Sequence, residues 1–109
     1  MLTNKKVLIT GGASGIGLAL AERFVQTGNT VIICGRRADV LEEAVARVPG
    51  LIGKVCDLSN EKERIALRDW VAAEHADLSV LVNNAGIQQW MKVDDDDFYE
   101  RTKAELAIN

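Results

Sequence analysis

Four short apolar runs recur along the chain at intervals of about 24 residues. Each run is rich in β-branched residues, as parallel strands buried on both faces are. The runs predict strands at residues 7–9, 31–34, 54–56 and 78–82. A sheet made of such strands needs helices on both of its faces.

Hydrophobic residues between these runs recur at the spacing of amphipathic helices. The expected helical faces comprise Ile16, Leu20, Phe24 and Val25, then Leu41, Ala44, Val45 and Val48, then Leu67, Trp70 and Val71. Gly28 and the pair Pro49-Gly50 mark the ends of the first two helices, and Asn60 with Glu63 resembles a capping pair that opens the third. The alternation predicts an α/β fold, a doubly wound, Rossmann-like parallel sheet of four strands with flanking helices and right-handed crossovers.

Four consecutive aspartates at residues 94–97 suit the positive end of a fourth helix, which we expect to continue through Phe98 and Leu106. A calcium loop is the less favoured alternative, because its alternating oxygen ligands and its glycine are missing. No repeat, linker or change of composition divides residues 1–109. The chain is therefore expected to form one domain.

Composition narrows the class of protein. The chain has 109 residues, 48% of them hydrophobic, and a net charge of −3, which argues against a surface that binds nucleic acid. No apolar run is long enough to span a membrane or to act as a signal peptide, so we expect a cytoplasmic protein. Cys34 and Cys56 are expected to be buried reduced thiols, and the lone His75 offers no metal site.

The segment from Thr10 to Gly17 lies between the first expected strand and the first expected helix. At such a junction the loop N–H groups and the positive end of the helix converge on one point, where a pyrophosphate fits. The glycines of the segment let phosphates approach the backbone, which side chains would block. A flexible turn without a ligand is the alternative, and the position between strand and helix favours the phosphate site.

Three motifs in this order resemble the amino-terminal part of the short-chain dehydrogenases/reductases. They are Thr10-Gly-x-x-x-Gly-x-Gly17, Cys56-Asp-Leu58 and Asn83-Asn-Ala-Gly86. Asn109 also falls where that family has an asparagine in the helix after the fourth strand. The resemblance runs from Val7 to Asn109, which is nearly the whole chain.

The resemblance implies a binding site for a nicotinamide dinucleotide. Its pyrophosphate loop would comprise Thr10, Gly11, Ser14, Gly15, Ile16 and Gly17, with Ser14 and Ile16 contributing backbone N–H groups. The adenine and ribose would be met by Asp57, Leu58, Asn83, Ala85 and Gly86. Asp57 would accept a hydrogen bond from the adenine amino group, and its alternative role is a helix N-cap. For the asparagine pair the alternative is a structural turn. With strand order 3-2-1-4, the glycine loop and the asparagine motif would face each other across a crevice.

The end of the second expected strand bears on the choice between the two nicotinamide cofactors. Where an acidic residue would bind the ribose hydroxyls of NAD, this chain has Gly35, followed by Arg36 and Arg37. A glycine leaves room there, and an arginine is a bidentate partner for a 2′-phosphate, so NADP is favoured over NAD. A solvated pair of loop arginines is the alternative. Ser14 fills the place where many NADP users carry a basic residue in the glycine loop.

The family's chemistry is a hydride transfer between the cofactor and a carbonyl or alcohol carbon, with a tyrosine, a lysine, a serine and an asparagine at the active site. Of these, the resemblance places only Asn109 in this chain. Tyr99 and Lys103 have the catalytic spacing, but they precede Asn109, so we expect them on a helix surface.

The resemblance therefore implies the cofactor-binding half of an NADP-preferring short-chain oxidoreductase that acts on a small carbonyl or alcohol substrate. We expect the chain to be the amino-terminal part of a longer protein, inactive by itself, that forms a homo-oligomer when complete. The alternatives are a non-catalytic nucleotide-binding module and a structural or regulatory fragment that assembles with a partner.

Overall fold

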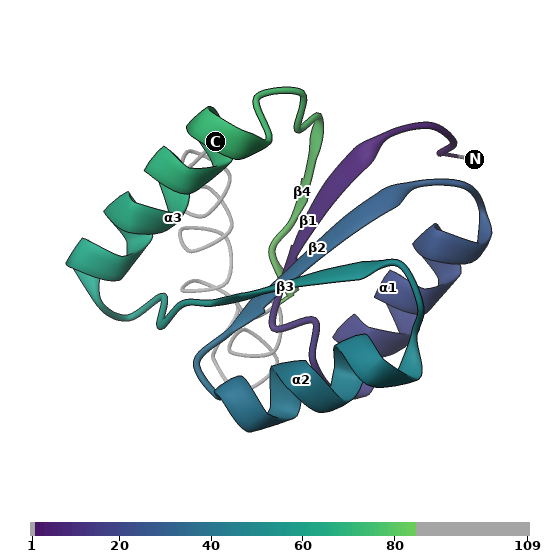
Figure 1. Cartoon of the computed structure of the whole chain (residues 1–109), viewed down its shortest axis with the longest axis horizontal. Helices are drawn as coiled ribbons and strands as arrows, with labels where there is room; N and C mark the ends of the chain where they lie inside the picture. Colours follow the sequence, from purple (N-terminus) through teal and green to yellow (C-terminus); the bar gives the residue numbers. More distant parts are fainter. Residues whose placement is uncertain (1, 85–109) are drawn as a thin grey trace, which may run out of the picture.

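A computed structural model of the chain describes residues 2–84, which alternate between strands and helices (Figure 1). The strands are β1 (Lys6–Thr10), β2 (Thr30–Gly35), β3 (Leu51–Val55) and β4 (Val80–Val82). The helices are α1 (Gly15–Gln26), α2 (Ala38–Arg47) and α3 (Glu61–Glu74). All strand pairs are parallel, and the strands lie in the order β3-β2-β1-β4. The expected doubly wound α/β fold and its strand order are confirmed, whereas the expected helix after residue 94 lies outside the described residues.

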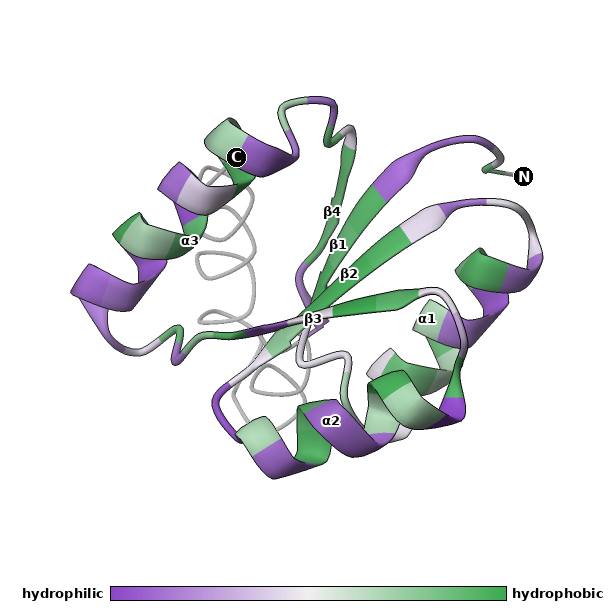
Figure 2. Ribbon diagram, in the orientation of Figure 1, coloured by the Kyte–Doolittle hydropathy of each residue, from purple (hydrophilic) through white to green (hydrophobic). Residues whose placement is uncertain are grey.

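The two central strands carry the core. Alternate side chains of β1 and β2 point to opposite faces of the sheet, and α1 and α2 cover one face while α3 covers the other (Figure 1). Six side chains of these strands are the largest that are fully buried: Val7, Ile9, Val31, Ile32, Ile33 and Cys34. Figure 2 shows these strands as the most continuous hydrophobic stretch of the sheet.

The outer strands depart from the expected burial on both faces. Along β3 buried or half-buried residues alternate with exposed ones, and Val55 is 50% exposed. All three residues of β4 are half-buried. Within the described part of the chain both strands lie at an edge of the sheet, so each has a neighbouring strand on one side only.

The third strand also begins earlier than expected. A turn through Pro49 and Gly50, in which Gly50 has φ 98° and the Leu51 N–H donates to the Val48 carbonyl at 3.3 Å, delivers the chain straight into β3. Pairing with β2 then starts at Leu51, and Cys56 lies just beyond the end of the strand. The apolar run marked only the last part of this strand.

The ends of the helices follow local rules. After α1, Gly28 has φ 90°, and the N–H groups of Gly28 and Asn29 donate to the carbonyls of Val25 and Phe24, both at 3.1 Å. This pair of hydrogen bonds is typical of a helix that ends at a residue with left-handed backbone, a conformation that glycine adopts without strain. At the start of α3, the Asn60 side chain accepts from the Glu63 N–H, as expected.

The helical spacing predicted that Ile16 packs against the core, and this prediction is wrong. Leu20, Phe24 and Val25 pack against the core as expected, but Ile16 is 64% exposed. Ile16 belongs to the first turn of α1, where the glycine loop delivers the chain at the end of the sheet rather than across its face. Its apolar side chain is therefore left open beside the loop.

Candidate functional site

The glycine loop joins the end of β1 to the start of α1. Gly11 and Gly15 both have left-handed backbone, with φ values of 66° and 57°. The Gly11 N–H donates to the Cys34 carbonyl at 2.9 Å, which ties the loop to the end of β2. A Cβ at Gly15 would meet no atom of the described residues within 4 Å, so they leave the space beside the first turn of α1 open.

The start of α1 is not capped by a side chain. Ser14 occupies the N-cap position with extended backbone, its side chain makes no capping hydrogen bond, and the first turn carries no acidic residue. The first N–H groups of a helix need partners, and the helix dipole favours an anion there. Open space at Gly15 together with these N–H groups fits the phosphates of a dinucleotide.

Gly12 and Gly17 are required for close packing. A Cβ on Gly12 would lie 2.5 Å from Cγ2 of Ile33. A Cβ on Gly17 would collide with the Gly11 carbonyl oxygen and lie 2.6 Å from Nδ2 of Asn84. The four glycines thus divide into two that turn the chain and two that let α1 and the loop pack against the sheet.

Side chains link the glycine loop to the end of β4. The Thr10 hydroxyl donates to Oδ1 of Asn83 at 2.9 Å, and Nδ2 of Asn84 donates to the Gly11 carbonyl at 3.1 Å. Asn84 is only 3% exposed. The loop and the asparagine motif therefore meet at the β1/β4 junction, as the strand order required.

Asn84 is a site residue that sequence reasoning passed over. The resemblance assigned a role to Asn83 alone of the two adjacent asparagines, yet both contact the loop across 73 positions of sequence. Asn83 accepts from the Thr10 hydroxyl, whereas Asn84 donates to the Gly11 carbonyl. Ala85, Gly86 and Asn109, which the resemblance adds to the site, lie outside the described residues.

The end of β2 presents two arginines in different situations. Arg37 donates to the Asp39 carboxylate at 3.0 Å, and both side chains are about two-thirds exposed or more, at 68% and 72%. Arg36 is exposed and has no hydrogen bond or ion pair with any residue from 2 to 84. Among residues 2–84, no atom lies within 4 Å of a Cβ placed at Gly35, so these residues leave an open space beside Arg36.

Asp57 follows β3 and lies next to this space. The Cys56 N–H donates to the Gly35 carbonyl at 2.8 Å, which brings the two strand ends together. The hydroxyl and the N–H of Ser59 both donate to Oδ1 of Asp57, at 2.6 and 3.0 Å. These bonds hold the pKa of the Asp57 carboxyl below its ordinary value, with a smaller contribution from the Arg36 charge.

The alternative role of Asp57 as a helix cap is wrong. α3 begins three residues later than that role required, and Asn60 caps it. Leu58, the next residue of the motif, packs against the core on the α3 side, and its carbonyl accepts from Nη1 of Arg64 at 2.6 Å. The Asp57 side chain thus stabilises the turn that precedes α3 and does not cap the helix.

The two cysteines are free and buried, as expected. Burial, followed by the nearby Cys56, raises the pKa of Cys34 to about 12. A thiol in this state does not ionise near neutral pH and is a poor nucleophile. Among residues 2–84 no group of three or more His, Cys, Asp or Glu side chains could hold a metal ion.

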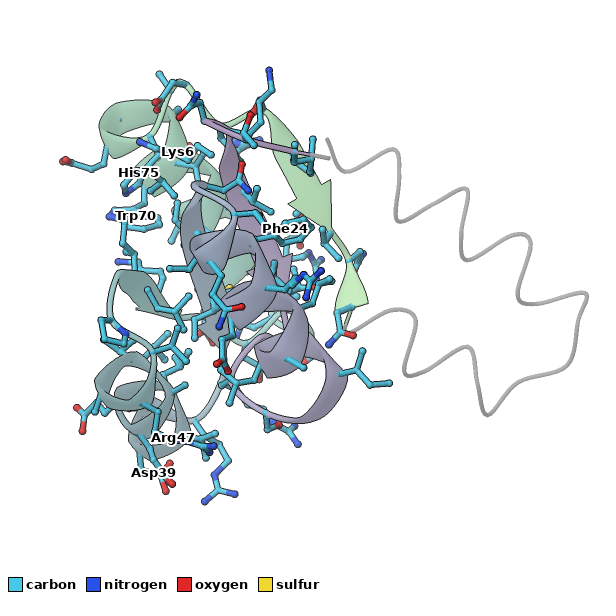
Figure 3. All side chains as sticks on the ribbon, turned by 90° about the vertical axis from the view of Figure 1, so that its right-hand side faces the viewer. Lys6, Phe24, Asp39, Arg47, Trp70 and His75 are labelled. Carbon is cyan, nitrogen blue, oxygen red and sulfur yellow. The ribbon has the colours of Figure 1, made fainter. Side chains whose placement is uncertain are left out.

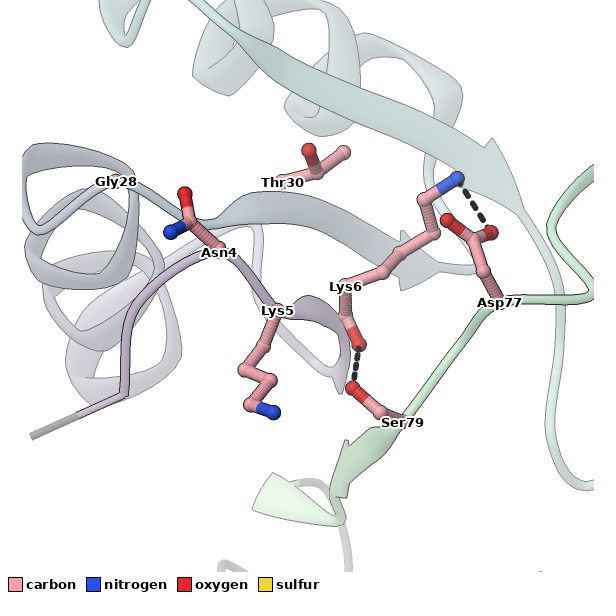
Figure 4. Close-up of a pocket in the computed structure, with 7 residues that line it drawn as sticks. All are labelled: Asn4, Lys5, Lys6, Gly28, Thr30, Asp77 and Ser79. Atoms are coloured by element: carbon pink, nitrogen blue, oxygen red, sulfur yellow. Dashed lines mark hydrogen bonds and ion pairs between the residues drawn. The ribbon is translucent and has the colours of Figure 1, made fainter.

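A polar hollow lies at the opposite end of the strands. It has a volume of about 470 Å³ and is lined by Asn4, Lys5, Lys6, Gly28, Thr30, Asp77 and Ser79 (Figure 4). Lys6 donates to Asp77 at 2.8 Å and lies 3.1 Å from Nδ1 of His75, whose ring stacks edge-on against Trp70. Figure 3 shows Lys6, His75 and Trp70 in succession along the α3 side of the molecule. The half-buried Lys6 ammonium in this hollow is thus already paired.

Comparison with known proteins identifies the class. The profile of the short chain dehydrogenase family matches residues 5–109. The chain belongs to this family of oxidoreductases.

Two curated relatives illustrate the match. The chain is 51% identical over 88 residues to the uncharacterised oxidoreductase DltE of Bacillus subtilis, which covers 81% of this chain and 35% of that protein. It is 39% identical over 111 residues to the NADP-dependent (R)-specific alcohol dehydrogenase of Lentilactobacillus kefiri, which covers 99% of this chain and 44% of that protein. The chain thus spans less than half the length of either relative.

Solved structures agree with this class. A variant of actinorhodin polyketide ketoreductase, crystallised with NADPH, is 32% identical, with a TM-score of 0.69 over 77% of this chain and 34% of that one. A short-chain type dehydrogenase/reductase from Mycobacterium ulcerans is 33% identical, with a TM-score of 0.70 over 76% of this chain and 34% of that one. Within residues 2–84 there is no helix whose length and apolar character would let it cross a membrane.

Proposed function

We propose that this protein is an oxidoreductase that transfers a hydride between NADP(H) and a small carbonyl or alcohol substrate, and that residues 10–84 contribute the dinucleotide site. One observation carries the proposal. The uncapped start of α1, Arg36, which has no ion pair within residues 2–84, and the carboxylate of Asp57 lie along the carboxyl ends of adjacent parallel strands. In an open α/β sheet this edge is where nucleotides bind.

Each part of the dinucleotide has a partner in this arrangement. The backbone of Gly11, Ser14, Gly15, Ile16 and Gly17 forms the pyrophosphate loop, and Thr10 fixes its start by bonding to Asn83. Asp57 receives the adenine amino group, with Leu58 beside it. The family resemblance assigns Asn83, Ala85 and Gly86 to the ribose and the end of the sheet. When bound, the nicotinamide supplies or accepts the hydride, and this segment binds and orients it.

The preference for NADP rests on the end of β2. Of the two arginines there, Arg36 is the one that no described residue neutralises by an ion pair, and the space at Gly35, which no described atom fills, would accommodate a phosphate next to it. Arg37 is the weaker candidate for the contact with the 2′-phosphate, because it already forms an ion pair with Asp39. The name of the L. kefiri relative and the NADPH in the ketoreductase crystal support the same choice. NAD is the alternative cofactor.

The reaction itself is proposed from the family. Asn109 is assigned to the catalytic site on the resemblance alone. A cytoplasmic location belongs to the same proposal, and the two buried free cysteines suit a reducing compartment.

Replacing Arg36 by Asp tests the cofactor assignment. Loss of a charge-assisted contact and addition of a repelling carboxylate should weaken NADPH binding by about 10- to 100-fold while sparing NADH. Titrations that follow tryptophan fluorescence measure both affinities. The matched control is Arg37→Asp, which makes the same charge change one residue away and should have a smaller effect.

Two outcomes contradict the proposal at different levels. An unchanged ratio of NADPH to NADH affinity in Arg36→Asp removes the 2′-phosphate assignment. Failure of the unaltered chain to bind either dinucleotide at millimolar concentration removes the nucleotide site altogether.

A further inference from the structure

All but one of the hydrogen-bonding groups of Asp57 are paired with residues between 59 and 63. Its carbonyl accepts from the Asn60 N–H at 3.0 Å, and Oδ1 accepts twice from Ser59. Its own N–H donates to Oε1 of Glu63 at 3.0 Å. Within residues 2–84, Oδ2 has no hydrogen-bond donor. The loop thus leaves a single oxygen of this carboxylate for a ligand.

Glu63 is bonded to both sides of this loop. Its backbone N–H donates to Oδ1 of Asn60 at 3.1 Å, its carbonyl accepts from the Cys56 thiol at 3.5 Å, and its carboxylate accepts from Asp57. In an ordinary capping box the carboxylate would reach back to the N–H of the capping residue. Here it passes beyond Asn60 and takes the N–H of Asp57.

This departure has a consequence for the orientation of Asp57. Ser59 fixes the side chain relative to its own backbone, whereas Glu63 fixes that backbone relative to α3. A side chain whose rotamer and backbone are both fixed presents its remaining oxygen in one direction. Neither residue extends the sheet or fills the core, since Ser59 is exposed and Glu63 is only half-buried.

We propose that Glu63 is a positioning residue that aims Oδ2 of Asp57 at the exocyclic amino group of the adenine, and that it thereby sets the selectivity of the site for this base. The inference rests on the proposed dinucleotide function and deepens it. An ionised carboxylate only accepts hydrogen bonds, so it favours an amino group over a carbonyl at the same place. Hypoxanthine carries a carbonyl where adenine carries the amino group. The preference for adenine over hypoxanthine therefore measures how well the Asp57 carboxylate is oriented toward the amino group.

The experiment compares NADPH with its hypoxanthine analogue, deamino-NADPH, on the same protein. The unaltered chain should bind NADPH more tightly. In Glu63→Ala this preference should fall about fivefold, the effect of one lost hydrogen bond. Glu63→Gln keeps an oxygen that can accept from Asp57 and should restore the preference.

Glu61 offers a matched control on the same helix. Both glutamates lie in the first turn of α3, so removing either one changes the helix dipole interaction in the same way. Glu61, however, is exposed and makes no hydrogen bond or ion pair within the described residues. Glu61→Ala should keep the adenine preference of the unaltered chain. If Glu63→Ala does not fold, Glu63→Asp, which keeps the charge but shortens the reach, should show the same loss of preference.

The outcomes separate the two levels of the proposal. The positioning role is overturned if the Glu63→Ala variant, or Glu63→Asp where that variant is used, prefers adenine as strongly as Glu61→Ala does. That result leaves the proposed dinucleotide site intact. A parallel loss of affinity for both dinucleotides, with their ratio unchanged, means that Glu63 only stabilises the fold and also overturns the inference. If the unaltered chain binds neither dinucleotide, the proposed function fails and the inference fails with it.

Discussion

The two ends of the sheet use polar groups in opposite ways. At the amino end of the strands, Lys6 is paired with Asp77 and His75, and the buried Asn29 bonds with its side chain to the backbone of Leu2, Lys5 and Phe24. At the carboxyl end, Gly15 borders open space, Arg36 has no described ion-pair partner, and one oxygen of Asp57 is left over. The polar side chains named at the amino end are thus paired with other residues of the described chain, whereas the groups named at the carboxyl end are available to a ligand.

This difference follows from the parallel arrangement. When all strands run the same way, every crossover helix begins at the carboxyl edge, so N–H groups without partners gather there. The amino edge receives the C-terminal ends of the helices, which close on themselves, as α1 does at Gly28. The comparison can be tested by substitutions at both ends, ordered below by their expected effect on nucleotide affinity.

Gly17→Ala should break the carboxyl end most strongly. The new Cβ collides with the Gly11 carbonyl and approaches Asn84, so the loop must move. We expect a loss of about 1–3 kcal/mol in the free energy of unfolding and NADPH affinity weaker by at least about tenfold. Urea unfolding and NADPH titration measure the two effects. Gly35→Ala is the control for the unfolding measurement only, because its Cβ would meet no atom of the described residues within 4 Å; an equal loss of stability in the two variants would contradict the packing role of Gly17.

Asn84→Ala and Asn29→Ala compare buried asparagines at the two ends. Asn84→Ala leaves the Gly11 carbonyl without its donor, which should cost about 1–3 kcal/mol and weaken NADPH several-fold by loosening the loop. Asn29 is 7% exposed and makes more bonds to the backbone, so its replacement should destabilise the chain at least as much. Its NADPH affinity should nevertheless stay near that of the unaltered chain. Loss of affinity in proportion to stability in both variants would remove the distinction between the ends.

Lys6→Met should have the smallest effect and none on NADPH. The Lys6 ammonium, as a hydrogen-bond donor, holds the pKa of Asp77 below its ordinary value. A lowered folded-state pKa stabilises the chain above the ordinary aspartate pKa of about 3.9. This contribution is lost as the pH falls through that range. The stability difference between Lys6→Met and the unaltered chain should therefore be full at pH 6 and shrink towards pH 3. Thermal melts at a series of pH values measure it, and a difference that grows on acidification would contradict the pairing.

Several elements could be predicted because their signals are local. Gly28 ends α1 since only a left-handed residue completes the bonds to Val25 and Phe24. Asn60 opens α3 since its side chain reaches a backbone N–H three residues away. The strand order followed from the doubly wound fold that the alternation of strands and helices predicted, which needs no knowledge of individual side chains.

Other features could not be predicted, because they depend on where the sheet ends. Ile16 has helical spacing with Leu20, yet it lies past the edge of the core and is exposed. The strand at residues 54–56 was misplaced because β3 pairs on one side only and therefore shows little continuous hydrophobicity. Within the site, the sequence did not single out Asn84 or Ser59, and it indicated Glu63 only as part of a capping pair, because their roles arise from hydrogen bonds in the folded loop.

The sequence by itself determined the alternation of strands and helices, the glycine-rich turn and the family, because these depend on periodicity, backbone freedom and motif order along the chain. Only the tertiary structure decided which glycines turn the loop and which pack it, and which of two adjacent arginines forms an ion pair with a described residue. Space and pairing are set by atoms from distant segments. Identical residues in one motif therefore take different roles once the strands are side by side.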